Sequence, residues 1–215
     1  RMRDIGLLPI GELVQPPRPA ARPERRLMTA ARFELRPLDP ERDADDLFRV
    51  GHGGPGADLL WTYMAYGPFD SRDGMLEWLE TCALTDDPLF YAVIERASGH
   101  RVGMCSFMSI VPEMQRIEIG HIWYAPPLQG SGISVEVAWM LLSEAFDRLG
   151  YRRVEWKCNA LNERSRRAAL KLGFTFEGVF RQHMIVKGRN RDSAWFSMLD
   201  REWASARVAL ERRMR

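Results

Sequence analysis

The sequence has no long apolar run. Its longest one, Val137 to Leu142, is far shorter than the ~18 residues that a membrane-spanning helix needs. Near the N-terminus, residues 5–10 are too few and too broken by proline to form the core of a secretory signal. We therefore expect a soluble protein with no membrane partner.

Cysteine is also scarce. Cys82, Cys105 and Cys158 lie far apart, and no Cys-x-x-Cys pair occurs. An odd number of scattered cysteines excludes a disulfide framework and a zinc site of the usual spacing. We predict reduced thiols, a cytoplasmic location and no bound metal.

Neither sign of charge dominates. The 31 basic and 29 acidic residues give a formal net charge of +2, which is too balanced to indicate a nucleic-acid partner. With 215 residues, 46% of them hydrophobic, the chain can form one large domain with extensions and a core that needs no metal or disulfide.

The composition divides the chain into three parts. Residues 1–32 form a basic, proline-rich N-terminal extension, 33–200 form the domain, and 201–215 form a helical tail. We interpret the extension as an arm that crosses the domain surface or pairs with a second subunit. Contact with an acidic partner or RNA is the alternative.

Hydrophobic periodicity and turn residues predict the elements of the domain. Helices are expected near 39–50, 71–82, 135–149 and 162–172, and residues 183–191 are expected to form a basic hairpin connection. The predicted strands are 33–38, 89–95, 101–110, 116–124, 152–158, 174–178 and 192–199. The strands before and after the helix at 135–149 should be parallel, because a strand–helix–strand unit makes a right-handed crossover.

The stretch from Gly120 to Gly150 organises this arrangement. A strand runs to Tyr124, Pro126 and Pro127 break it, and residues 129–132 (Gln-Gly-Ser-Gly) turn the chain into the long helix. The first N–H groups of a helix have no partner within it, and the helix dipole makes that end positive. The turn could therefore hold an anion such as phosphate.

Several local motifs now make a resemblance visible. They are residues 118–123 (EIGHIW), 129–132 (QGSG), 162–165 (NERS), 171–178 (KLGFTFEG), 180–184 (FRQHM) and 195–196 (WF). Over roughly 33–200 the chain resembles the GNAT superfamily of acetyl-coenzyme A-dependent N-acetyltransferases, and within it the RimJ/RimL-like branch. The chain departs from the family pattern at Pro127, the first loop position, where the family has Gln or Arg.

The resemblance implies an α/β (α+β) fold: a mixed, mostly antiparallel central sheet flanked by helices, in which a parallel strand pair splays at the cofactor cleft. It also implies that acetyl-CoA is the co-substrate. The residues expected to bind it are Ile122, Trp123, Tyr124, Gln129, Gly130, Ser131, Gly132, Ile133, Ser134, Asn162 and Ser165.

Transfer of acetyl from a thioester to an amine needs a proton acceptor, an oxyanion contact and a proton donor for the thiolate. Glu118 is the candidate base, and it could instead anchor the substrate ammonium or pair with an arginine. Ser165 is the candidate acid by resemblance, and it is also placed to start a helix capped by Asn162. We expect His121, on the opposite face from Glu118, to be a packing residue.

Two segments would shape the acceptor side. Residues 61–69 are rich in aromatics, a pattern typical of a core or a dimer surface, and His183 lies in the basic turn. The expected acceptor-binding residues are Trp61, Tyr63, Tyr66, Phe69 and His183.

We therefore predict an N-acetyltransferase that moves acetyl from acetyl-CoA to a primary amine, either a protein N-terminus or a small molecule, by direct attack in a ternary complex. A homodimer is left open. The alternatives are a non-catalytic acyl-CoA-binding module and a protein that contacts the ribosome or RNA.

Overall fold

Within residues 8–215, which the computed structural model describes, eight strands form one sheet. The order is β1-β2-β3-β4-β5-β6-β8-β7, and among these strands only β5 and β6 pair in parallel. The predicted mixed, mostly antiparallel sheet is confirmed. The strands are β1 (Met28–Thr29), β2 (Phe33–Pro37), β3 (Leu89–Glu95), β4 (Arg101–Val111), β5 (Arg116–Tyr124), β6 (Arg153–Asn159), β7 (Thr175–Val186) and β8 (Arg189–Leu199).

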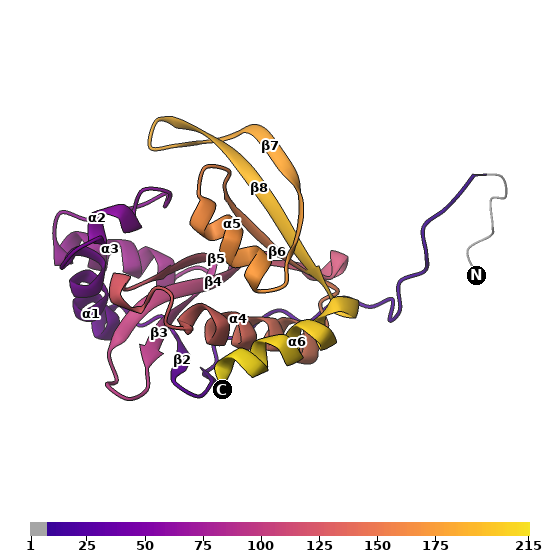
Figure 1. The fold of residues 1–215 in the computed structure, drawn as a ribbon, viewed down its shortest axis with the longest axis horizontal. Helices are drawn as coiled ribbons and strands as arrows, with labels where there is room; N and C mark the ends of the chain where they lie inside the picture. Colours follow the sequence, from indigo (N-terminus) through magenta and orange to yellow (C-terminus); the bar gives the residue numbers. More distant parts are fainter. Residues whose placement is uncertain (1–7) are drawn as a thin grey trace.

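Helices cover both faces of the sheet (Figure 1). On one face α4, α5 and α6 pack over the larger apolar cluster, and on the other α1 and α3 pack over a smaller one. The helices are α1 (Pro40–His52), α2 (Ala57–Leu60), α3 (Arg72–Ala83), α4 (Ile133–Ser143), α5 (Glu163–Lys171) and α6 (Asp200–Met214), with short turns η1 (Pro112–Met114), η2 (Pro126–Leu128) and η3 (Glu144–Arg148).

The helix predicted between the two parallel strands is α4, extended by η3. The α-helical hydrogen bonding gives way at Glu144 to a π-helical turn, and Gly150 follows with φ of 77°. The positive φ explains the glycine. In the crossover β5–α4–β6, helix α4 is largely buried, and its N-terminus follows the end of β5.

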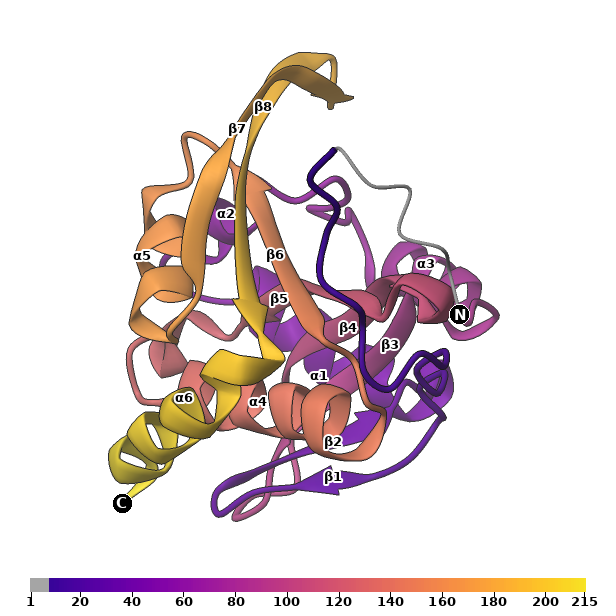
Figure 2. The ribbon, with the colours of Figure 1, turned by 90° about the vertical axis from the view of Figure 1, so that its right-hand side faces the viewer.

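The hairpin predicted around residues 183–191 is confirmed, but its connection is much shorter than predicted. β7 and β8 run on as a long hairpin, joined by a two-residue turn at Lys187 and Gly188 with φ of 50° and 72°. Two positive φ values are the mark of the tight turns that match strand twist. The hairpin projects beyond the helices (Figures 1 and 2), so the side chains of β7 are largely exposed, apolar ones such as Phe180 and Ile185 included.

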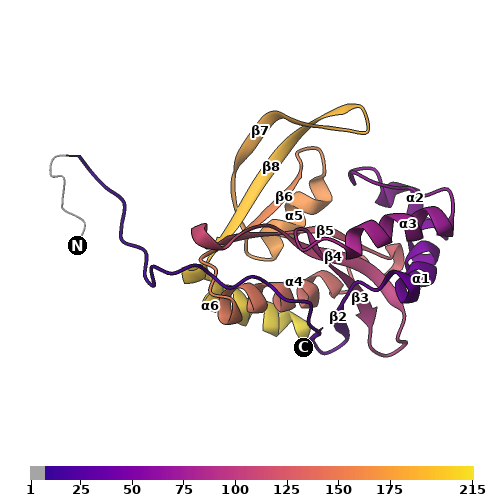
Figure 3. The same ribbon diagram turned by 180° about the vertical axis from the view of Figure 1, so that it is seen from behind.

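The N-terminal arm lies along the domain from about residue 16 onward (Figures 2 and 3). The N–H of Ala20 donates to the carbonyl of Pro112 at 3.0 Å, and the N–H of Ala21 to that of Leu149 at 2.9 Å. Gln115 Nε2 donates to two arm carbonyls, and Met28 is buried in β1. The arm thus contributes a strand to the sheet. Residues 1–7 of the predicted extension lie outside the described part of the chain.

The predicted C-terminal tail is helix α6, and it packs on α4. Trp203 and Leu210 are buried, and Trp203 Nε1 donates to Asp147 Oδ1 at 2.9 Å. The three cysteines are free and buried, as the prediction of reduced thiols requires.

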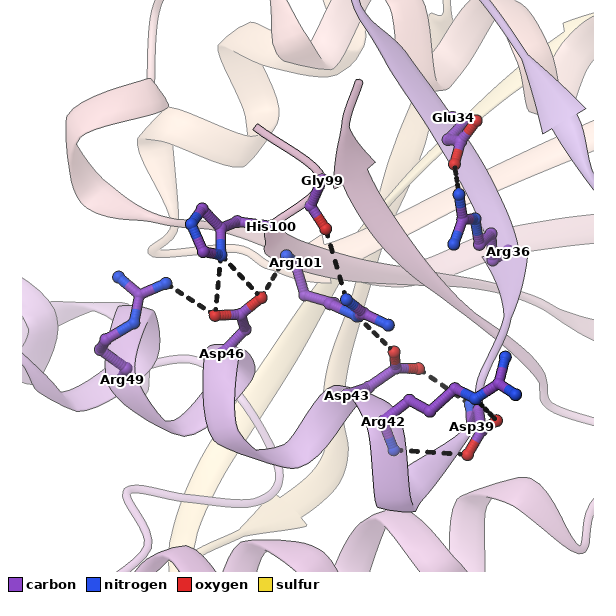
Figure 4. A network of polar contacts seen from close by, with 10 residues as sticks. All are labelled: Glu34, Arg36, Asp39, Arg42, Asp43, Asp46, Arg49, Gly99, His100 and Arg101. Carbon is purple, nitrogen blue, oxygen red and sulfur yellow. Dashed lines mark hydrogen bonds and ion pairs between the residues drawn. The ribbon is translucent and has the colours of Figure 1, made fainter. Parts of the chain in front are cut away.

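A polar network ties α1 to the start of β4 (Figure 4). Arg101 Nε donates to Asp43 Oδ1 at 2.7 Å, and the side chain of Asp43 is only 4% exposed. The N–H of Arg101 donates to Asp46 Oδ2 at 3.0 Å, and Asp46 also accepts from Arg49 and contacts His100 Nδ1. Asp43 also accepts from the N–H of Asp39 at 2.8 Å, so among the described residues Arg101 is its one charged partner.

We expect Arg101→Met to lower the free energy of unfolding by about 3–5 kcal/mol, because it leaves a buried charge without its partner. Arg49→Met is the matched control: Arg49 is exposed and pairs near the surface, so its loss should cost under about 1 kcal/mol. Denaturant unfolding of the two variants measures both values. Equal losses in the free energy of unfolding would mean that the Asp43–Arg101 pair stabilises the fold no more than the surface pair does.

Candidate active site

The two parallel strands separate soon after they meet. Their pairing covers three register positions, Arg116 with Arg153, Ile117 with Val154 and Glu118 with Glu155. Just after these paired residues β5 carries a bulge, because its register with β4 shifts between Gly120 and Trp123. His121, inside the bulge, has φ of 51°. A bulge bends its strand and increases the local twist, so β5 turns away from β6.

The bend leaves the last residues of β5 with one unpaired edge. The N–H of Ala125 donates to the carbonyl of Val102 at 2.7 Å, on the β4 side. Backbone groups alternate along an antiparallel ladder, so the N–H groups of Tyr124 and Ile122 face the open side. The carbonyl of Tyr124 also faces that side, where it accepts from Gln129 Nε2 at 3.2 Å. The N–H groups of two of the predicted cofactor-binding residues thus point away from β4, toward the side that β6 has left.

The glycine turn follows β5 directly. Gly130 and Gly132 have φ of 86° and 95°, and Gly132 is the N-cap of α4. The N–H of Ser131 is used inside the turn by the carbonyl of Leu128. In the described chain the N–H groups of Gly130, Gly132, Ile133 and Ser134 have no hydrogen-bond partner. Among the amides predicted to bind an anion, that of Ser131 is therefore already engaged within the turn.

Two arginines flank this turn, and sequence reasoning did not assign either to the site. Arg32 Nη1 donates to the carbonyl of Ser131 at 3.1 Å, while its Nε pairs with the fully buried Glu136 at 2.6 Å. Arg164 Nη1 donates to Gln129 Oε1 at 3.1 Å. Arg32 precedes the turn by about a hundred residues, so no local pattern could have revealed it.

Asn162 and Ser165 form the opposite wall. Asn162 Oδ1 accepts from the N–H of Ser165 at 3.1 Å and so caps α5, as predicted. Ser165 Oγ accepts from Trp156 Nε1 of β6 at 3.0 Å. The serine hydroxyl therefore lies beside the strand that diverges from β5, where Cys158 of that strand is also within its reach.

Glu118 lies where the strands part and is buried. Its Oε2 accepts from Ser109 Oγ at 3.1 Å and from Lys157 Nζ at 3.3 Å. Burial raises the pKa of the Glu118 carboxyl, and Lys157 and Ser109 act against this rise. A carboxyl with a raised pKa at a cleft is suited to exchange protons near neutral pH.

His121 packs among aromatic rings. It stacks on Tyr66 with ring centroids 5.6 Å apart and lies 4.8 Å from Phe90. Burial, with further contributions from Lys157 and Arg191, lowers the pKa of His121 from 6.5 to about 4. The imidazole is therefore neutral at pH 7, which fits the expected packing role.

Some aromatic side chains of residues 61–69 lie in the core, and others lie at the cleft. Trp61 is buried and its Nε1 donates to the carbonyl of Gly51 at 2.8 Å, while Phe69 packs against Trp61. Tyr66 is half-buried on His121, and Tyr63 donates to the carbonyl of Leu161 at 3.2 Å. Trp61 is therefore a framework residue, and the two tyrosines lie closer to the β5 bulge and α5.

The β7–β8 hairpin reaches over to this segment. Lys187 Nζ, at its tip, donates to the carbonyl of Trp61 at 2.9 Å. His183 is exposed, its Nδ1 lies 2.8 Å from Ser193 Oγ, and its ring packs near Trp195. Trp195 in turn lies under Lys157, whose Nζ is 5.0 Å from the ring centroid. Lys157 and Trp195 are further residues that sequence reasoning did not select.

The described helices include none that is both long enough and apolar enough to span a membrane. Among residues 8–215 no cluster of three or more His, Cys, Asp or Glu side chains is placed to hold a metal ion.

Comparison with known proteins agrees with this geometry. A family described as "Acetyltransferase (GNAT) domain" matches residues 32–175, more than half of the chain. The "Putative ribosomal N-acetyltransferase YdaF" of Bacillus subtilis (strain 168) is 33% identical over 105 residues, which cover 49% of this chain and 57% of YdaF. The match thus spans a little over half of YdaF's own length.

Solved structures agree as well. A GCN5-related N-acetyltransferase from Brucella melitensis superimposes with a TM-score of 0.91 at 40% identity, covering 94% of this chain and 91% of that one. Mycobacterium smegmatis RimJ in complex with CoA-disulfide has a TM-score of 0.75 at 21% identity, covering 87% and 94%, a likeness that concerns the fold alone. The chain therefore belongs to the GNAT family of acetyltransferases, in agreement with its RimJ/RimL-like motifs.

Proposed function

We propose that the protein transfers acetyl from acetyl-CoA to a primary amine by direct attack in a ternary complex. The observation that carries this proposal is the separation of β5 from β6 after Glu118, which leaves the amides of Ile122 and Tyr124 facing the open side, beside a glycine turn with four free amides. An open backbone edge that continues into an anion-binding turn suits a ligand with an amide-bearing arm and a diphosphate.

The residues at this edge fit acetyl-CoA. The free N–H groups of Gly130, Gly132, Ile133 and Ser134 would hold the diphosphate, and the edge at Tyr124 would pair with the pantetheine arm. Pro127 cannot contribute an N–H or a cationic side chain. Arg32 and Arg164, on either side of the turn, would supply the missing positive charge. The complex of Mycobacterium smegmatis RimJ, which shares this fold, with CoA-disulfide supports this fit.

Acetyl-CoA, when bound, supplies an activated acetyl group as a thioester. Around it the chain offers the three groups that transfer requires. Glu118 would hold the proton that leaves the acceptor amine, or anchor the ammonium before it is lost. The amide of Ile122, nearer the point where the strands part, would donate to the carbonyl oxygen as it gains charge, which leaves the amide of Tyr124 for the pantetheine arm. Ser165 would return a proton to the departing sulfur.

The acceptor would enter from the side of Tyr66 and the β7–β8 hairpin, with Tyr63, Phe69 and His183 at the margins and Trp61 behind them. Both a protein N-terminus and a small-molecule amine remain proposed acceptors. The word "ribosomal" in the name of YdaF supports the first of these.

We expect Glu118→Gln to lower kcat by about 100-fold or more, in the range found for loss of a general base. Because burial raises the pKa of Glu118, activity of the unaltered protein should fall as the pH drops through that raised value, and the variant should lose this acidic limb. Thiol release from acetyl-CoA, followed against pH with an amine acceptor, measures both.

Glu155→Gln is the matched control. Glu155 is a buried glutamate beside Glu118 on the neighbouring strand, and its ion-pair partners are Arg116 and Arg153. Its negative charge contributes to the raised pKa of Glu118, so Glu155→Gln should move the acidic limb to lower pH and still keep it. A rise in KM with unchanged kcat in Glu118→Gln would assign Glu118 to anchoring. Full activity with an unchanged pH profile would exclude both roles.

Gly132→Ala tests the turn. The new Cβ would lie 2.7 Å from Arg32 Nη2, and the residue would keep a φ of 95° that alanine adopts poorly. We expect CoA affinity to fall by about 10-fold, as calorimetry would measure, since roughly one charge-assisted hydrogen bond is disturbed.

Gly99→Ala separates the two causes. Gly99 has a similar φ of 72° and open space around its Cβ position, in the turn between β3 and β4. Both variants should lose about 1–2 kcal/mol of stability from the left-handed conformation, and only Gly132→Ala should lose CoA affinity. Unchanged CoA binding in Gly132→Ala would remove the turn from the proposed site.

A further inference from the structure

A group of side chains on β6 and β8 lies beside Glu118 and is not used by the transfer chemistry above. Lys157 and Trp195 are register partners on these two strands and contact each other. Arg191 lies four residues before Trp195 on β8, so the two side chains share one face of the sheet. Ser193, between them on that face, holds His183 of β7. Together they form a wall of the acceptor side.

Arg191 is the least satisfied member of this wall. Its side chain is half-buried, and its Nε is fully buried without a hydrogen-bond partner. No ion pair of the described chain includes Arg191. The buried Nε1 of Trp195 also has no partner. Both orphaned atoms are donors, and buried donors without acceptors are costly.

The charges of the wall are also unbalanced. Lys157 and Arg191 are cationic, and the carboxylate of Glu118 pairs with Lys157 and lies near Arg191. Glu118 is already engaged by Lys157 at 3.3 Å. His121 adds no charge, since its pKa is lowered to about 4 by burial and by these same cations. The exposed part of the half-buried Arg191 guanidinium and the surplus positive charge around it match an anion that is planar and accepts several hydrogen bonds.

We propose that the acceptor amine carries a carboxylate, and that Arg191 binds this carboxylate while the amine lies at Glu118. The inference rests on the proposed function and specifies its substrate class. The carboxylate has two chemical sources: the α-carboxylate of a free amino acid, or an acidic side chain close to a peptide N-terminus. The same cations repel an ammonium ion and so favour the neutral amine that attacks, while a carboxylate on the acceptor gives it a net attraction to this wall.

The test uses two pairs of acceptors that differ only in the carboxylate. L-phenylalanine is compared with L-phenylalaninamide, and the peptide amide Ala-Asp-Ala with Ala-Asn-Ala. Binding of each to the CoA-loaded protein is measured by calorimetry, and thiol release from acetyl-CoA is followed in parallel. We expect the carboxylate member of at least one pair to bind about 10- to 100-fold more tightly, the value of a charge-assisted pair.

Arg191→Gln should abolish most of this preference and leave binding of the uncharged member unchanged within about two-fold. Arg181→Gln is the matched control, because it removes the same charge from an exposed position of the same hairpin. It should preserve the preference. The pair that discriminates identifies the source of the carboxylate.

Equal binding within both pairs would overturn the proposal. So would a preference that persists in Arg191→Gln, or one that Arg181→Gln removes equally. If no acceptor releases thiol although CoA binds, the proposed transfer fails, while the binding preference still decides the role of Arg191.

Discussion

The structure depends on one interruption in hydrogen bonding: β5 and β6 stop pairing after Glu118. Backbone N–H groups in the middle of a sheet normally have partners, because leaving them unpaired is costly. Here the bulge at His121 turns β5 away, and the strand continues into a glycine turn whose amides are also free. The protein keeps this open edge at the centre of its sheet, where an added ligand strand would complete the ladder.

The surrounding structure maintains that opening from both ends. On the side where β5 and β6 still pair, residues 116–118 hold the short parallel ladder. At the start of α4, Arg32 of the arm pairs with the buried Glu136. On the acceptor side, Lys187 of the β7–β8 hairpin donates to the carbonyl of Trp61. Tyr63, in the same aromatic segment as Trp61, donates to the carbonyl of Leu161 in the loop before α5. The two faces of the opening therefore differ. Amides and two arginines border the α4 side, while aromatic rings, Glu118 and uncompensated cations border the hairpin side.

The sequence predicted the fold class and most elements because hydrophobic period, glycines and helix caps act locally. Asn162 and Ser165 could be placed as a cap and its target, and Gly130 and Gly132 as a turn, from spacing alone. The hairpin between the last two strands was predicted, but its length was underestimated, because β7 is exposed along nearly its whole length and so has no buried face to set an alternating pattern. Arg32, Lys157 and Arg191 were missed because their place in the site comes from sheet register and from an arm about a hundred residues away, which no local pattern encodes.

The most direct test of the open edge is hydrogen exchange at single amides, measured with and without saturating CoA. The account predicts that the amides of Ile122 and Tyr124 exchange rapidly in the free protein and slow by about 10-fold or more on CoA binding. Amides in the parallel ladder, such as that of Ile117, should change little. Protection of Ile122 and Tyr124 before CoA is added, or no change in their exchange when CoA binds, would contradict it.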